Sequence, residues 1–144
     1  MAVQRDNPYP NHNFSVDIGA GDTIGFSEVE LPSGEIEVIQ YREGSDPARS
    51  SRKLPGLVTY PNVTLRRGIT GNLELYQWWK SVRDGQLLRR DVRITLLDEQ
   101  RQPVLRWLLR DAWPAKLEAG PLNAQANEVA IETLELAHEG FELD

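Results

Sequence analysis

The sequence predicts a mainly β domain, with an antiparallel sheet and one packed α-helix. Several stretches alternate apolar and polar residues with a period of two, which is typical of half-buried antiparallel strands. One stretch instead repeats apolar residues at helical spacing. The chain has 144 residues, of which 40% are hydrophobic, so one domain with a sizeable core is expected.

The alternation places the expected strands. In the first run, Phe14, Val16 and Ile18 form an apolar face, and Ser15 and Asp17 lie on the other face. The last two runs are joined by DEQRQP, which is typical of a hairpin loop. A further strand begins at VTLRRG, and the alternating or β-branched runs are residues 14–18, 36–41, 91–97 and 104–110.

A helix is expected over residues 72–84. Asn72 is a suitable N-cap, and Gly85 is a suitable stop at the C-terminal end. Tryptophans at helical spacing favour a buried face over a stacking surface, because base-stacking aromatics are expected on an exposed sheet face. The apolar face repeats at i, i+3, i+4 and i+7 and comprises Leu75, Trp78, Trp79 and Val82.

Glycines separate this helix from the preceding strand. Gly68 and Gly71 are expected to be structural turns, because RGITG supplies too few backbone N–H groups in register to cradle a phosphate.

The C-terminal segment is ambiguous. Val129 and Ile131 would share one strand face, and Leu134 and Leu136 the other, so a strand needs a bulge between them. We prefer a strand to a helix through Ala130, Leu134 and Ala137.

Two stretches lack periodicity. Residues 42–56 are polar and contain Gly, Ser and Pro throughout, and residues 118–127 form a shorter loop. A loop as long as the first is usually functional or disordered when it belongs to a compact domain.

Charge is segregated along the chain. Up to Tyr41 there are seven acids against Arg5, residues 42–116 hold fifteen Lys/Arg against eight acids, and residues 117–144 hold seven acids and no Lys/Arg. These charges either neutralise one another within a monomer or support head-to-tail association of copies. The net charge of −6 argues against a dedicated nucleic-acid binder.

The composition predicts a soluble protein of a reducing cytoplasm. The absence of cysteine excludes disulfides and thiolate metal sites. The N-terminal sequence MAVQRDNPYPNHN is too polar for a signal peptide, and no apolar run approaches the ~18 residues of a membrane span.

No catalytic, cofactor or metal site is predicted. His12 lies in the polar N-terminal tail, and His138 has only Glu135 and Glu139 beside it, which is an incomplete metal site. An enzyme using His138 with one of these glutamates remains one alternative. Another is an OB-like module for nucleic acid or sugar, with a basic patch of Arg66, Arg67, Arg89 and Arg90.

A family resemblance rests on an ordered set of motifs. GFSEV, YREG, KLPG, LRRG, the tryptophan-bearing helix, AWPAK and NEVAIETLELAHEG follow one another in this chain. Each motif is weak alone, but in this order and at this length they resemble the tail-tube protein family of contractile phages. That family includes the inner-tube subunits of phage-derived contractile injection systems. The resemblance covers residues 14–143.

The resemblance implies a small antiparallel β-barrel or sandwich with one packed helix, formed by residues 14–144 after a polar arm of residues 1–13. Six copies would close into a ring with a continuous inner β-barrel, and rings would stack into a hollow conduit. No enzymatic activity and no cofactor are implied. The loop of residues 42–56 would contact another subunit through Arg42, Glu43, Asp46, Arg49, Arg52, Lys53, Leu54 and Pro55.

The implied partners are other copies of the chain, a contractile sheath protein, baseplate or hub and tail-terminator proteins, and a tape-measure protein or cargo in the lumen. No membrane insertion by this chain is implied. Assembly is expected in a bacterial or host cytoplasm, followed by incorporation into a phage tail, virion or injection particle. A tube-initiator paralogue at the baseplate is the alternative within the family.

Overall fold

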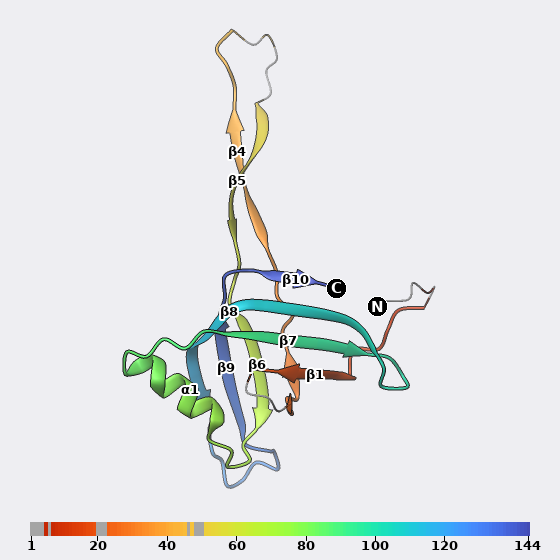
Figure 1. The fold of residues 1–144 in the computed structure, drawn as a ribbon, viewed down its shortest axis with the longest axis vertical. Coiled ribbons are helices and arrows are strands. Elements are labelled where there is room, and N and C mark those ends of the chain that lie inside the picture. Colours follow the sequence, from red (N-terminus) through yellow and green to blue (C-terminus); the bar gives the residue numbers. More distant parts are fainter. Residues whose placement is uncertain (1–4, 6, 20–22, 46, 48–50) are drawn as a thin grey trace.

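A computed structural model describes residues 5, 7–19, 23–45, 47 and 51–144. Figure 1 shows a body of crossing strands with a helix on one side and a long hairpin that projects away from it. In chain order the elements are β1 (Phe14–Asp17), β2 (Thr23–Ile24), β3 (Glu28–Val29), β4 (Glu35–Tyr41), β5 (Arg52–Thr59), β6 (Val63–Gly68), α1 (Glu74–Arg83), β7 (Arg90–Leu97), β8 (Pro103–Ala119), β9 (Ile131–Ala137) and β10 (Phe141–Leu143).

The long strand β8 connects two halves of the sheet. The strand order is β2-β1-β7-β8-β9-β6-β3, and β10 also pairs with β8. The register of β8 shifts against β7 between Leu109 and Ala112, where Asp111 has a φ of 52°, and shifts against β9 between Pro114 and Lys116. Such bulges bend a strand. Consequently β7 and β9, on either side of the bend, run in clearly different directions (Figure 1).

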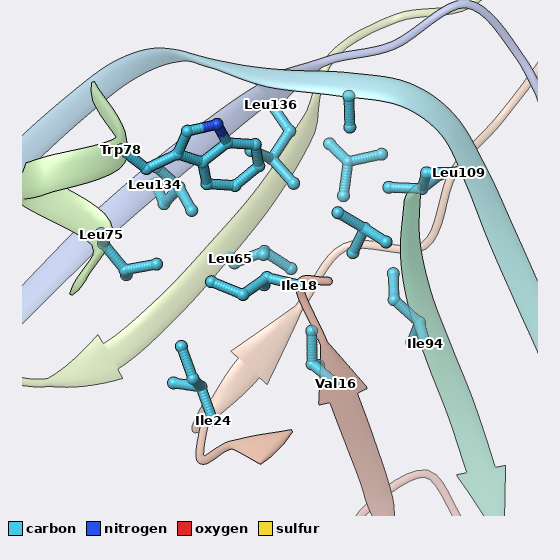
Figure 2. Close-up of a cluster of buried hydrophobic side chains, with 13 residues drawn as sticks. Val16, Ile18, Ile24, Leu65, Leu75, Trp78, Ile94, Leu109, Leu134 and Leu136 are labelled. Carbon is cyan, nitrogen blue, oxygen red and sulfur yellow. The ribbon is translucent and has the colours of Figure 1, made fainter. Parts of the chain in front are cut away.

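The core lies between these two halves and beneath the helix (Figure 2). One half contributes Val16, Ile94 and Leu109, and the other contributes Leu65 and Leu134, all at most 1% exposed. Strand alternation explains why these residues are the buried ones, since residues two apart on a strand share a face. Further buried members of this cluster are Ile18, Ile24, Val63, Leu75, Trp78, Val92, Ala112 and Leu136.

The C-terminal end of the helix is as the sequence predicts, but its N-cap residue is Leu73 and not Asn72. The side chain of Asn72 accepts a hydrogen bond from the Glu74 N–H at 2.8 Å, just before the helix begins. At the other end, Gly85 has a φ of 94° and its N–H bonds to the Val82 carbonyl, while the Gln86 N–H bonds to Ser81. This is the hydrogen-bond pattern of a Schellman motif.

The two glycines before the helix differ. Gly71 has a φ of 87°, in the left-handed region where glycine is favoured. Gly68, by contrast, is the last residue of β6 and pairs with Ile131, so the turn begins after it.

The prediction of a mainly β antiparallel fold with a packed helix is confirmed. So are the strands in residues 14–18, 36–41, 91–97 and 104–110, the hairpin loop DEQRQP, and the choice of a strand over a helix near the C-terminus. The bulge expected in that last strand is wrong, because β9 pairs with β6 without a register shift and Val129 lies before it. In the part of the chain that the structure describes, no helix has the length and apolar character to cross a membrane.

Candidate subunit interface

The β4–β5 hairpin stands apart from the body. Its strands form a two-stranded sheet of their own, and they project along the long axis of the molecule (Figure 1). The prediction of a loop over residues 42–56 is therefore wrong for Arg52–Gly56, which belong to β5. A two-stranded hairpin is at best marginally stable in water.

Both faces of this hairpin carry exposed apolar side chains. Val38 pairs with Pro55, and Ile39 pairs with Leu54. Because neighbouring residues on a strand point to opposite faces, Val38 and Ile39 present apolar groups on the two sides, at 59% and 46% exposure. Large exposed apolar surfaces mark interaction sites. Ile36, Tyr41, Leu57 and Val58 are also exposed.

The predicted contact residues divide between the hairpin and its tip. Arg42 and Glu43 directly follow β4, and the Tyr41 hydroxyl donates a hydrogen bond to Glu43. Arg52, Lys53, Leu54 and Pro55 lie in β5. Asp46 and Arg49 lie outside the described residues.

The half-sheet β2-β1-β7-β8-β10 has an edge strand on each side. Among the described strands, β2 pairs with β1 alone and β10 pairs with β8 alone. Asp144 exchanges backbone hydrogen bonds with Arg106, so in antiparallel geometry the N–H of the preceding Leu143 points away from β8. Edge strands of this kind are templates for pairing with another chain.

The helix face lies in the core rather than at an edge. Leu75 and Trp78 are 1% and 2% exposed, and the Trp78 indole N–H donates a hydrogen bond of 2.8 Å to the Leu88 carbonyl. The guanidinium of Arg90 lies 4.7 Å from the centre of the Trp78 ring. Trp79 and Val82 are half-buried. A stacking platform for bases needs exposed rings, which Trp78 does not provide.

The four arginines of the alternative basic patch do not form one surface. Arg67 is 4% exposed, and it also donates a hydrogen bond to the Asn72 carbonyl. Arg66 lies 3.3 Å from a carboxylate oxygen on the neighbouring strand β3. The interaction partners of Arg66, Arg67, Arg89 and Arg90 are, in turn, Glu28, Glu132, Glu139 and the ring of Trp78.

His138 has a structural role. Its Nε2 lies 3.1 Å from the Pro61 carbonyl, and its Nδ1 lies 3.2 Å from the backbone N of Gly140. Nδ1 also lies 3.2 Å from the Gly140 carbonyl, so backbone groups surround both ring nitrogens. The flanking glutamates bond elsewhere, to Asn62 and Arg89. No group of three or more metal-ligating side chains occurs among the described residues.

The described part of the N-terminal arm is tied to the β7–β8 turn. Arg5 donates two hydrogen bonds, of 3.0 and 2.9 Å, to the carboxylate of Glu99, and its guanidinium lies 3.8 Å from the centre of the Tyr9 ring. These hydrogen bonds from Arg5 lower the pKa of Glu99 to about 2.

These features define a β-domain whose edges and hairpin are suited to joining subunits, without a catalytic constellation in the described residues. Residues 10–142 match the T4-like virus tail tube protein gp19 family, and the chain belongs to that family. It is therefore a structural tube subunit and not an enzyme. A comparison with proteins of curated function found no match.

Solved structures of contractile injection systems contain similar chains. One, in the baseplate of the anti-feeding prophage, is 29% identical with a TM-score of 0.86, and the alignment covers 96% of this chain and 97% of that one. Another, in the extended sheath–tube complex of the extracellular contractile injection system PVC, is 27% identical with a TM-score of 0.85, covering 95% and 91%. Hcp1 from Flavobacterium johnsoniae shares the fold at 14% identity, with a TM-score of 0.58 and coverage of 90% and 93%.

Proposed function

We propose that six copies of this chain close into a ring and that these rings stack into the hollow inner tube of a contractile tail or injection system. The observation that carries the proposal is the pair of open edges, β2 with β1 on one side and β10 on the other. Joining β10 of one copy to the β1–β2 edge of the next is a heterologous contact. Such a contact forms a closed ring when the rotation between neighbouring copies divides a full turn evenly. Closure pairs the two edges of this half-sheet and joins the six half-sheets into one continuous barrel.

The outer face of the same half-sheet suits a water-filled channel. Along β7, buried Val92 and Ile94 point to the core, while Arg93 between them is exposed. In the pairing register this row runs from Asp17 through Arg93 and Leu108 to Glu142, so it is polar except at Leu108. A barrel wall needs this alternation, with one face packed and the other solvated. This face is the proposed lining of the lumen.

The hairpin is the proposed contact between rings. Its tip and strand β5 hold the contact residues Arg42, Glu43, Asp46, Arg49, Arg52, Lys53, Leu54 and Pro55. Exposed apolar groups on both hairpin faces support this role, because association would remove them from water.

The proposed partners follow from the similar proteins. Those proteins lie in the baseplate and the tube-terminating cap of the anti-feeding prophage and in the sheath–tube complex of PVC. This chain would accordingly be enclosed by a sheath protein, begin at a baseplate and end at a terminator. A tape-measure protein or cargo in the lumen stays a prediction. The comparisons favour neither the tube initiator nor the OB-like module.

Electron microscopy of the purified protein tests the proposal. Wild-type protein is expected to form six-fold rings or tubes, whereas monodisperse monomers would refute it. Leu143→Pro removes an N–H that points away from β8, so it should block ring closure while the pairing of β10 with β8 persists. Leu143→Val, which keeps the N–H, is the matched control and should assemble normally.

A further inference from the structure

The loop between β8 and β9, residues 120–130, exposes apolar side chains without cover from the rest of the described chain. Leu122 is 84% exposed and Val129 is 72% exposed. The loop encloses a hollow of about 500 Å³ to which it contributes every lining residue, including Ala124 and Ala126. Association of this surface with another molecule would remove it from water.

Backbone hydrogen bonds hold this β8–β9 loop in shape. The Gly120 N–H bonds to the Ile131 carbonyl at 2.8 Å, and the Ile69 N–H bonds to the Ala130 carbonyl at 2.9 Å. Within the loop, the Asn123 side chain accepts a hydrogen bond from the Gln125 N–H at 3.0 Å. The apolar groups are thus presented on a preformed support, which lowers the entropic cost of binding.

The loop and the hairpin are complementary in charge. Glu128 lies in the loop directly before Val129 and makes no ion pair among the described residues, whereas Glu118 at the start of the loop pairs with Lys116 at 3.0 Å. On the hairpin, basic Arg52 and Lys53 directly precede the exposed Leu54. An apolar patch beside basic groups can therefore meet an apolar hollow beside an acidic group.

The two surfaces also lie at opposite ends of the molecule. In Figure 1 the hairpin reaches one end of the long axis, and the connection from β8 to β9 forms the other end. Complementary sites at opposite ends of one chain produce a head-to-tail contact, which repeats from copy to copy.

We propose that the β8–β9 loop of one copy receives the β4–β5 hairpin of a copy in the next ring. This inference rests on the proposed function and names the site at which rings meet. Leu54 packs against Leu122 and Val129, and Lys53 lies beside Glu128.

A second groove is the competing receiver. It has a volume of about 630 Å³ and lies between the N-terminal arm and the sheet, with Phe14, Leu31 and Trp107 among its lining residues. Leu31 is only four residues before β4 begins, so this groove borders the base of the chain's own hairpin. A hairpin that arrives from a stacked copy meets the opposite end first, which favours the loop.

Cysteine pairs distinguish the two receivers, because the chain has no cysteine of its own. A disulfide needs Cα atoms about 4.4–6.8 Å apart, so it reports close approach. Tubes of Leu54→Cys/Leu122→Cys, oxidised and run on a non-reducing gel, should give a ladder of linked subunits. The matched Leu54→Cys/Leu31→Cys tubes should not. The inference would be overturned if the Leu54→Cys/Leu122→Cys variant formed tubes but gave no ladder. A ladder from the Leu54→Cys/Leu31→Cys variant would also overturn it. Wild-type protein that forms no tubes would instead refute the proposed function.

A charge exchange provides an independent measurement. Glu128→Lys and Lys53→Glu should each raise the subunit concentration needed for tube formation by about two- to five-fold, the worth of an exposed ion pair. The combined variant should return it towards the wild-type value. If the effects of the two substitutions on this concentration simply add in the combined variant, the two residues are not in contact.

Discussion

Replacing Trp78 by alanine tests whether the helix face is part of the core. The side chain is 2% exposed. A buried tryptophan removes about 150–250 Å² from water, which at about 25 cal/mol/Å² is worth about 4–6 kcal/mol. Partial collapse around the cavity offsets some of this, so the expected loss in free energy of unfolding is about 3–5 kcal/mol. The lost hydrogen bond to the Leu88 carbonyl adds little, because Leu88 is 49% exposed and water can replace the donor.

The assay is urea unfolding followed by circular dichroism, with Trp79→Ala as the matched control on the same helix. Trp79 is half-buried, so its replacement should cost clearly less. Both variants need the same subunit concentration, because assembly stabilises the folded state by mass action. Equal losses in the two variants, or an unchanged midpoint for Trp78→Ala, would refute the assignment of Trp78 to the core.

Three further predictions concern the hairpin, a buried ion pair and the N-terminal arm. Replacing residues 45–51 by a short Gly/Ser linker should leave the circular dichroism spectrum β-rich and stop stacking; long tubes in electron microscopy would contradict the role of the tip. Arg67→Met should cost about 3 kcal/mol in urea unfolding, because it strands the carboxylate of Glu132, whereas the combined Arg67→Met/Glu132→Leu variant should recover most of it. The contact of Arg5 with Glu99 is complete above the ordinary pKa of a glutamate and is lost as pH falls towards about 2, since that pKa is lowered in the fold. An NMR titration should show the pKa of Glu99 rising towards its ordinary value in Arg5→Ala, with a backbone hydrogen bond still lowering it, and an unchanged pKa would exclude Arg5 as the main cause.

The sequence was informative wherever one face of an element is buried. In residues 14–18 and 91–97, the period-two pattern follows directly from a strand with a core face and a solvated face. The helix was equally clear, because its apolar spacing and the stop at Gly85 agree with the structure, although the N-cap residue is Leu73 and not Asn72. Local propensity and tertiary packing favour the same structure in these elements.

The second strand of the hairpin was missed because neither face of the hairpin is buried, so no core-facing alternation marks it. Pro55 and Gly56 in KLPG are typical of a turn, and proline weakens the prediction of a strand. In the structure β5 continues through both residues, and the opposite strand shifts register between Ile36 and Val38. A Cβ atom at Gly56 would lie 2.9 Å from the Ile39 side chain and 3.1 Å from the Glu37 carbonyl oxygen, so a larger residue there would crowd the bulge.

The sequence pattern also did not predict the C-terminal half of β8. The predicted strand ended at Arg110, whereas β8 runs to Ala119 by placing bulges near Asp111 and Ala115. A bulge adds a residue to one strand and reverses the alternation beyond it, so a strict period of two is lost. Periodicity also cannot predict which strands lie at the edges of the sheet, because that depends on which strands become neighbours.

The segregation of charge along the chain has two explanations, and the structure separates them by region. In the body, arginines of the basic middle pair with acids of the two acidic ends: Arg66 with Glu28, Arg89 with Glu139, and Arg110 with Glu142. There, neutralisation within the monomer accounts for the pattern. Within the described part of the chain, Lys53 on the hairpin and Glu128 on the β8–β9 loop make no ion pair. At these two ends of the molecule, charge without an ion pair coincides with exposed apolar residues, and a head-to-tail contact there combines both forces.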